Sequence, residues 1–372
     1  MNTPASYSSK AIPTIVDRNY WFVRTDSGRF FDDFYENNYI AIGWDYLNLN
    51  TISSEDKDMD HLKRRIALTE GLLIDDIDDD SLNDDELSEL NSKLTNNRRI
   101  VTKIYNKVNL FVNEIKPGDI VVIPSANSSY IAIGIVSDDI YENTNYIEQF
   151  AQLHFTADYM PCPYAKRFPV TWYKKINKNG MDIYLQNTIK AQQAIFPLND
   201  HADYIDRNVM DIYFKNDILH SIIRTNQDGD ITLTELKFLI DFIYDGISQS
   251  NEGLNDISPD DVRVKLNIHS PGIIEIISIG TMSIVGLITL FSVWSVHRNG
   301  GKVNISGKEG RGFSFETKGS KAVEIENARL ELIKNMIQDE NLNEKIEKLE
   351  NLNLHIPDLS SLIDEPADSS DD

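Results

Sequence analysis

The chain of 372 residues contains a single cysteine, Cys162, and its 36 lysines and arginines stand against 59 aspartates and glutamates. One cysteine excludes an intrachain disulfide framework and any zinc site built from several cysteines, and it fits a reducing compartment. The N-terminus lacks a basic region followed by an apolar core, so we see no secretory signal and expect a cytoplasmic protein. The net charge of −23 disfavours a protein that coats nucleic acid by charge alone.

The negative charge is concentrated in one segment. Residues 1–180 hold 19 Lys/Arg and 27 Asp/Glu, of which residues 51–95 alone hold 5 and 14. The remainder of this region is close to neutral, so the overall charge does not exclude a local basic groove. Helical pieces between Asp-rich breaks indicate that residues 51–95 form a solvated insertion.

Strand patterns dominate the first half of the chain. Aromatic and β-branched residues predict strands at residues 20–25, 39–45, 120–124, 130–136 and 167–176. Apolar residues recur every three to four positions over residues 97–115, which predicts a helix. Pro117 and Gly118 end this helix at a Lys-Pro-Gly-Asp corner. We expect the strands to form a small β-barrel-like sheet.

The order of the fragments YWFVRT, IAIGWD, a helix, EIKPGDIVVIPS, IAIGIV and RFPVTWYK resembles the EVE/YTH-type branch of the PUA-like superfamily. The resemblance covers residues 15–180, with the acidic insertion 51–95 outside it. Similar patterns stand at the N-termini of modification-dependent restriction and defence proteins. The resemblance implies a pocket that accepts a flipped, often modified base between aromatic side chains. The pocket-wall positions that it implies are Trp21, Trp44, Pro124 and Ser125.

Physical chemistry bounds what such a pocket can do. Stacking on an aromatic face contributes about 1–3 kcal/mol per base, and extruding the base from a duplex costs a few kcal/mol. Core packing is the alternative interpretation for each tryptophan, because tryptophans are highly buried on average. The candidate phosphate contacts are Arg98, Arg99, Lys166 and Arg167, for which solvated surface charge is the alternative.

Helical patterns increase after residue 190. We expect amphipathic helices at residues 208–224 and 233–248, a strand at 260–270, a hairpin at 300–317 and one or two charged helices at 321–350. These elements would form a mainly helical C-terminal module at residues 195–355, followed by a disordered acidic tail at 356–372. The fold class is therefore predicted as α+β.

An apolar segment, residues 276–296, contains 21 residues without a charge. This length can span a bilayer. Two alternatives remain open: a transmembrane helix, or a long apolar helix buried in the second domain or in an oligomer.

No motif in the sequence predicts catalysis or metal binding. Residues 224–235 resemble an EF-hand calcium loop, with Gly229 and Glu235 at positions 6 and 12, but Arg224 occupies the first ligand position. The histidines lack metal-ligand spacing, and no phosphate-binding loop or nucleophile elbow is present. We therefore expect neither a metal nor a cofactor, and more readily a non-enzymatic protein than an enzyme.

The sequence leaves three functional hypotheses. In the first, a bacterial antiviral-defence protein binds a nucleic-acid feature or a nucleotide-like ligand through its N-terminal domain, and its C-terminal module acts at the inner membrane or in oligomerisation. In the second, the chain is a soluble adaptor that binds a partner protein through its acidic surface. In the third, it is the specificity subunit of a separately encoded nuclease.

Overall fold

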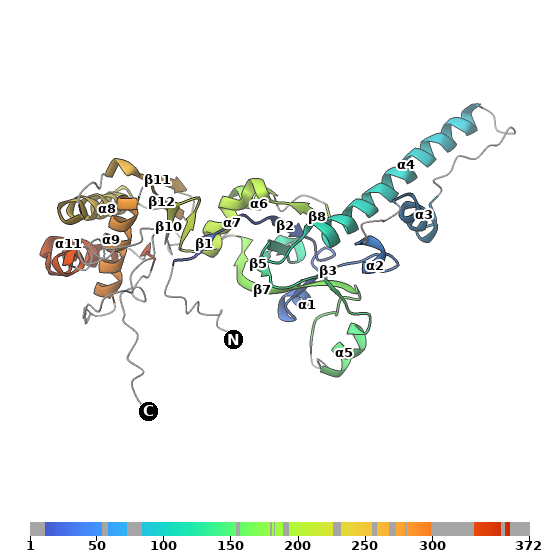
Figure 1. The fold of residues 1–372 in the computed structure, drawn as a ribbon, viewed down its shortest axis with the longest axis horizontal. Helices are drawn as coiled ribbons and strands as arrows, with labels where there is room; N and C mark the ends of the chain where they lie inside the picture. The colour runs from blue at the N-terminus through green and yellow to red at the C-terminus, as the bar shows by residue number, and fades with distance from the viewer. Residues whose placement is uncertain are drawn as a thin grey trace, which may run out of the picture. The chain divides into compact units, whose positions relative to one another are not determined.

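The computed structural model describes residues 12–53, 59–72, 84–153, 157–178, 181, 183–188, 193–225, 232–254, 259–267, 273–279, 281–298, 331–350 and 354–357. The chain divides into two compact units (Figure 1). The first unit contains Arg18–Ile205, and the second contains the chain from Asp206 onwards together with the residues just before Arg18. Both units combine strands and helices, so the α+β class is confirmed.

The first unit is built on a mixed sheet. Its strands are β2 (Tyr20–Val23), β3 (Tyr39–Ile42), β4 (Ile120–Pro124), β5 (Tyr130–Val136), β6 (Tyr141–Glu142), β7 (Lys166–Asn177) and β8 (Ile195–Pro197). They follow the order β3-β7-β5-β4-β2-β8, with β6 also paired to β7. β2 and β4 are parallel, and the other pairs are antiparallel. The long strand β7 pairs with β3 through its first residues and with β5 through its last, so it joins β3 to the rest of the sheet.

Helices cover this sheet and extend beyond it. They are α1 (Phe31–Glu36), α2 (Leu49–Ile52), α3 (Met59–Thr69), α4 (Asp84–Asn109), α5 (Tyr146–Leu153) and α6 (Ile183–Thr188), while α7 (Ala202–Val209) spans the boundary between the units. A π-helical turn, Leu110–Glu114, continues α4 to the Lys-Pro-Gly-Asp corner. The strands and the helix that the sequence predicts in this half are thus present.

The predicted insertion is not wholly solvated. α3 lies beside α4 (Figure 1) and buries Leu62, Ile66 and Ala67 in the hydrophobic core of the unit. Ile66 and Ala67 follow Leu62 by four and five positions, so the three residues form one apolar face of the helix. Part of residues 51–95 thus belongs to the fold, and the charged residues of α3 lie outside this buried face.

The second unit contains a sheet and several helices. Its strands are β1 (Thr14–Ile15), β9 (Ile212–Lys215), β10 (Ile218–Thr225), β11 (Val262–Asn267), β12 (Ile273–Ser278) and β13 (Leu354–His355). Their order is β1-β9-β10-β12-β11, with β13 beside β10. The helices are α8 (Leu233–Leu254), α9 (Thr281–Arg298), a helix at residues 331–338 and α11 (Glu340–Glu350). Leu219, Ile274 and Ile276 of the sheet share a core with these helices.

The prediction of a helix at residues 208–224 is wrong. The segment ends α7 and then forms the β9–β10 hairpin, whose strands pair antiparallel. Asn216 and Asp217 connect them with φ of 52° and 59°. Two successive positive φ values are typical of the type I′ turn, whose twist suits a hairpin. The second unit therefore combines a six-stranded sheet with its helices.

The prediction of one long apolar helix over residues 276–296 is also wrong. Ile276–Ser278 belong to β12, and α9 begins only at Thr281. Residues 286–294 of α9 are all buried, and they contribute Leu290, Phe291 and Trp294 to the core of the second unit. Among the described residues, none of the helices combines the length and the apolarity needed to cross a bilayer.

Two further predictions are confirmed by α8 and β11, and residues 331–350 form a pair of helices. The hairpin at residues 300–317 and the tail from residue 358 lie outside the described residues.

Candidate functional site

Trp21 lies inside the first unit rather than on a pocket wall. Its side chain is 6% exposed, and its Nε1–H donates a hydrogen bond of 2.8 Å to Oδ2 of Asp119. The Asp119 carboxylate also accepts hydrogen bonds from the backbone N–H groups of Asn19 and Lys116. Trp21 therefore fastens the Lys-Pro-Gly-Asp corner to strand β2.

Four loops of the first unit meet in what we call the loop cluster: Asp26–Phe30, Gly43–Asp45, Ser125–Ser128 and Met160–Tyr164. At Gly28 the backbone approaches so closely that an added Cβ would lie 2.1 Å from the backbone nitrogen of Ala126. Thr25 reinforces this approach, since its hydroxyl donates a hydrogen bond of 2.6 Å to the carbonyl of Pro124. Pro124 itself is buried at the end of β4, and Ser125 follows it, half-buried, in the cluster.

Tyr164 connects the other loops of the cluster. Its ring packs edge-on against Phe30 at 5.4 Å between centroids, and an added Cβ on Gly43 would lie 3.0 Å from the same ring. Arg29 lies over Phe30, at 5.3 Å from the ring centroid, and its Nε–H donates to the sulfur of Met160. Arg29 and Met160 are both exposed, so the cluster presents a guanidinium, a thioether and a half-buried phenol.

Strained backbone is concentrated in the loop cluster. Positive φ values occur at the non-glycine residues Asp26, Ser27, Trp44, Asn127 and Ser128. A left-handed conformation costs an ordinary residue about 1–2 kcal/mol and is rare for a bulky one. Conformations of this kind gather at binding and catalytic sites, where the surrounding structure enforces them.

Trp44 is the most unusual of these residues. It adopts φ of 58°, is half-buried, and lies beneath the ammonium of Lys107, 5.5 Å from the ring centroid. Its carbonyl accepts a hydrogen bond of 3.1 Å from Nζ of Lys166, which also pairs with Asp45 at 2.8 Å. Lys166 therefore holds the backbone around Trp44, whose side chain is only partly buried against the core.

Lys107 is one of three basic residues in a row on α4, which we call the α4 basic row: Arg99, Lys103 and Lys107. They are spaced four residues apart, so they lie on one face of the helix and span about 12 Å along its axis. Arg99 and Lys103 are exposed, and no ion pair involves any of the three within the described residues. Arg98 is exposed beside the row.

Arg167 is enclosed in the first unit and cannot reach a phosphate in this structure. The guanidinium lies between the rings of Tyr39 and Tyr146, at 4.1 and 3.5 Å from their centroids, and donates hydrogen bonds to the carbonyls of Cys162 and Tyr164. Its side chain, like that of Lys166, is 0% exposed. Both residues therefore act in the structure of the site rather than on its surface.

A buried carboxylate accompanies Arg167. Asp33 accepts hydrogen bonds from the hydroxyls of Tyr39 and Tyr146 and from the backbone N–H of Cys162. Burial raises the pKa of Cys162 to about 12 and raises the pKa of both tyrosines. The thiol is therefore neutral and unreactive at physiological pH, as expected for an inert structural cysteine.

The structure thus brings two of the sequence candidates for the pocket wall, Trp44 and Ser125, into one loop cluster. Arg99 belongs to the α4 basic row, of which Lys107 lies over Trp44. Trp21, Pro124, Lys166 and Arg167 lie in the interior. Sequence reasoning missed Lys103 and Lys107, although their spacing of four residues from Arg99 was visible. It also missed Gly28 and Tyr164, for which only three-dimensional contacts provide a signal.

The described residues of the calcium-loop pattern make interactions other than metal binding. Arg224 belongs to β10 and pairs with Asp211 at 2.8 Å. Glu235 forms a capping box with Thr232 at the start of α8: each backbone N–H donates to the other residue's side chain. Within the described residues, no group of three or more His, Cys, Asp or Glu side chains could hold a metal ion.

Comparison with known proteins identifies one similarity. A family model described as a domain of unknown function (DUF8426) matches residues 51–199. The match begins in α2, so it includes the acidic segment and the strands from β4 to β8 but not β2 or β3. No curated protein and no solved structure matches the chain.

Proposed function

We propose that the first unit is a PUA/EVE-like domain that binds single-stranded or locally opened nucleic acid. A base stacks on Trp44 at the loop cluster, and the adjoining phosphates lie along the α4 basic row. The observation that carries the proposal is the placement of Trp44, which is held in a left-handed conformation, half-exposed, beneath Lys107.

Charge and stacking support this assignment together. Aromatic platforms beside a cationic track are the usual means by which proteins bind single strands without reading sequence. The basic row supplies up to three cations on one face, although the protein as a whole is acidic. Such a local field attracts phosphate at short range, because the acidic charges elsewhere are screened beyond about 8–10 Å at physiological ionic strength.

The remaining residues of the loop cluster offer the means to recognise a base. Arg29 can stack or donate hydrogen bonds, Met160 supplies a polarisable apolar surface, and Tyr164 supplies a ring with a hydroxyl. A modified base is the ligand that the EVE-type resemblance implies. We therefore propose that this cluster senses the base and that antiviral defence is the setting, by analogy with proteins that share the sequence pattern.

Binding of fluorescein-labelled oligonucleotides to the full chain tests the proposal. The probes are single-stranded DNA, single-stranded RNA and a duplex with one modified base, followed by fluorescence anisotropy. We expect Trp44→Ala to weaken binding by about 1–3 kcal/mol, the contribution of one stacked base. The double variant Arg99→Glu/Lys103→Glu should weaken it further, because both cations become anions.

Lys93→Glu provides the matched control for charge reversal. Lys93 is exposed on the same helix, six residues before Arg99, and therefore about 240° away around the axis. The control should bind like the unaltered protein, and circular dichroism should show that every variant is folded. Equal affinity of the Trp44 variant and the unaltered chain for every probe would refute the assignment of the site.

A further inference from the structure

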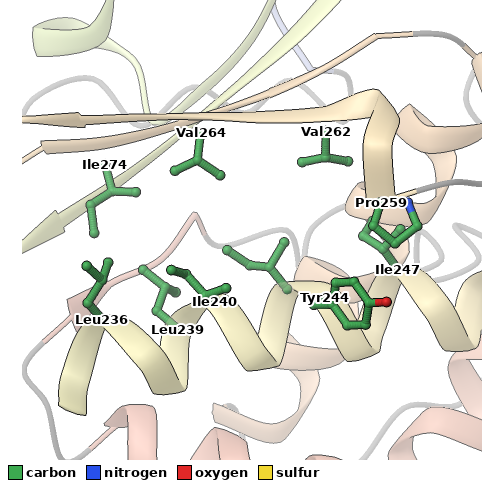
Figure 2. A pocket seen from close by; sticks show the side chains of 10 residues that line it. Leu236, Leu239, Ile240, Tyr244, Ile247, Pro259, Val262, Val264 and Ile274 are labelled. Carbon is green, nitrogen blue, oxygen red and sulfur yellow. The ribbon is translucent and has the colours of Figure 1, made fainter. Parts of the chain in front are cut away.

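An apolar groove lies on the second unit between α8 and β11. It has a volume of about 160 Å³, and its walls include Leu236, Ile240 and Tyr244 from the helix and Val262, Val264 and Ile274 from the sheet. Figure 2 shows the side chains of α8 pointing towards those of β11 and β12 across the groove. The lining contains no charged side chain.

The rim of this groove is exposed, whereas its floor is part of the core. Ile240, Tyr244 and Val264 are 46%, 57% and 43% exposed, whereas Leu239 and Ile247 are 1% and 0% exposed. A contiguous apolar patch of this kind on a soluble surface marks a site of interaction more often than scattered apolar residues do.

An open strand edge runs beside the groove. β11 is the last strand in the order of its sheet within the described residues, and it pairs only with β12. Among the described residues, no strand pairs with the backbone N–H and C=O groups on its other edge, so these groups are open to a further strand. A strand edge next to an apolar groove is the arrangement used in recognition by strand addition: the backbone supplies affinity, and the groove selects alternate side chains.

The charged residues of β11 determine which side chains are favourable on the other face of an added strand. Arg263 and Lys265 alternate with Val262 and Val264, so they lie on the opposite side of the sheet from the groove. Both are exposed, and Lys265 is paired with Glu275 at 3.8 Å, which places it on that face. Residues of an added strand opposite Arg263 and Lys265 would be favourable if they were acidic.

We propose that β11 and the groove bind an extended segment of a partner protein in which apolar residues alternate with acidic ones. The apolar residues enter the groove against Ile240, Tyr244 and Val264. The acidic residues lie opposite Arg263 and Lys265. A second copy of the chain fits less well, because two β11 strands paired with their apolar faces together would bring these cations opposite one another.

Peptide binding to the full chain tests this proposal. The probe is a fluorescein-labelled peptide of about eight residues in which valine alternates with glutamate, long enough to pair with the six residues of β11. The comparison peptide carries lysine in place of each glutamate. We expect the glutamate peptide to bind and to slow hydrogen exchange of β11 amides, and the lysine peptide to bind at least about tenfold more weakly.

Two variants test the two features separately. Ile240→Ser removes an exposed apolar wall, and Arg263→Glu reverses an exposed charge, so both proteins should fold. Each should weaken binding of the glutamate peptide by about tenfold, the effect of losing one interface anchor. Leu233→Ser and Lys334→Glu are the matched controls, because both residues are exposed and lie outside the groove lining. The controls should change Kd less than about twofold.

The proposal is overturned if the two peptides bind equally, if neither binds at about 1 mM, or if the groove variants behave like their controls. Light scattering measures whether the other occupant, a second copy of the chain, fills the groove in a dimer. A dimer that Ile240→Ser dissociates would replace the proposal with self-association through the same groove.

Discussion

The indole of Trp21 donates a hydrogen bond to the carboxylate of Asp119, which lies 98 residues further along the chain. The same carboxylate accepts hydrogen bonds from the backbone N–H groups of Lys116 and Asn19, so one side chain closes the corner and attaches it to the neighbouring strand. The corner can therefore direct β4 into the sheet next to β2. The loop cluster begins where β2 and β4 end, so the corner and the cluster lie at opposite ends of β4.

Trp21→Phe should destabilise the first unit without abolishing oligonucleotide binding. Phenylalanine retains most of the buried apolar surface but leaves the Asp119 carboxylate without one donor, which costs about 1–3 kcal/mol. Urea-induced unfolding followed by circular dichroism measures the loss. An unchanged unfolding midpoint together with weaker oligonucleotide binding would instead give Trp21 a direct role in the ligand site.

Two glycines with nearly equal backbone angles should respond differently to alanine. Gly28 and Gly118 have φ of 93° and 94°, but an added Cβ at Gly28 would meet the backbone of Ala126, and at Gly118 it would meet nothing within 4 Å. Gly118→Ala should cost about 1–2 kcal/mol in free energy of unfolding, the conformational penalty alone. Gly28→Ala should cost more, because the backbone of the loop cluster must also move.

The comparison of the two variants separates strain from close approach. Chemical unfolding of both proteins gives the two free energies, and oligonucleotide anisotropy shows whether the loop cluster has moved. If Gly28→Ala is no more costly than Gly118→Ala, the contact between the two loops is looser than the structure indicates.

Local patterns were sufficient for the elements of the first unit. The strands at residues 20–25 and 120–124 are rich in aromatic and β-branched residues, and the apolar spacing over residues 97–115 continues through four turns of helix. Both signals are local and strong. The segments 208–224 and 276–296 were misjudged for the same reason. A short apolar run does not by itself distinguish a strand from a helix, and the turn at Asn216 and Asp217 was overlooked.

The candidate site was harder to predict, because the role of a side chain depends on partners that are distant in sequence. Trp21 and Trp44 both lie within predicted strands, but one reaches Asp119 in the core and the other remains half-exposed under Lys107. Arg167 is of a residue type that often contacts phosphate, but two tyrosine rings enclose its guanidinium. No local pattern distinguishes these outcomes.

The second unit should lose stability in acid through Glu275. This carboxylate is 1% exposed, lies 2.7 Å from Nδ1 of His220 and is paired with Arg207 and Lys265. Burial raises the pKa of Glu275, but the hydrogen bond from His220 and the surrounding positive charges outweigh it, so the pKa of this carboxyl lies below its ordinary value. Because the folded state binds the proton less readily than the unfolded state, the stabilisation is complete above the unfolded-state pKa. It is lost as pH falls through the folded-state pKa.

Glu275→Gln tests this linkage. At pH 7 the variant should be less stable by about 3–5 kcal/mol, the cost of breaking a buried ion pair. The difference from the unaltered protein should narrow as pH falls below the unfolded-state pKa of glutamate, about 4.3, and through the lower folded-state pKa. Chemical unfolding across this range measures it, with the exposed Glu331→Gln as the control. A difference that stays constant with pH would show that Glu275 contributes through packing rather than charge.

Salt dependence should distinguish the α4 basic row from Trp44 as parts of the proposed nucleic-acid site. Each phosphate neutralised by a lysine or arginine releases counterions, so the logarithm of the binding constant falls linearly with the logarithm of salt concentration. Lys103→Ala should reduce this slope by about 0.7 for a single strand, since one phosphate contact is lost. Trp44→Ala should weaken binding at every salt concentration and leave the slope unchanged, because stacking releases no counterions. Anisotropy titrations between about 50 and 200 mM salt give both slopes. If the Lys103 slope equals that of the unaltered protein, the phosphates do not follow this face of α4, and the exposed Arg98 beside it becomes the residue to replace next.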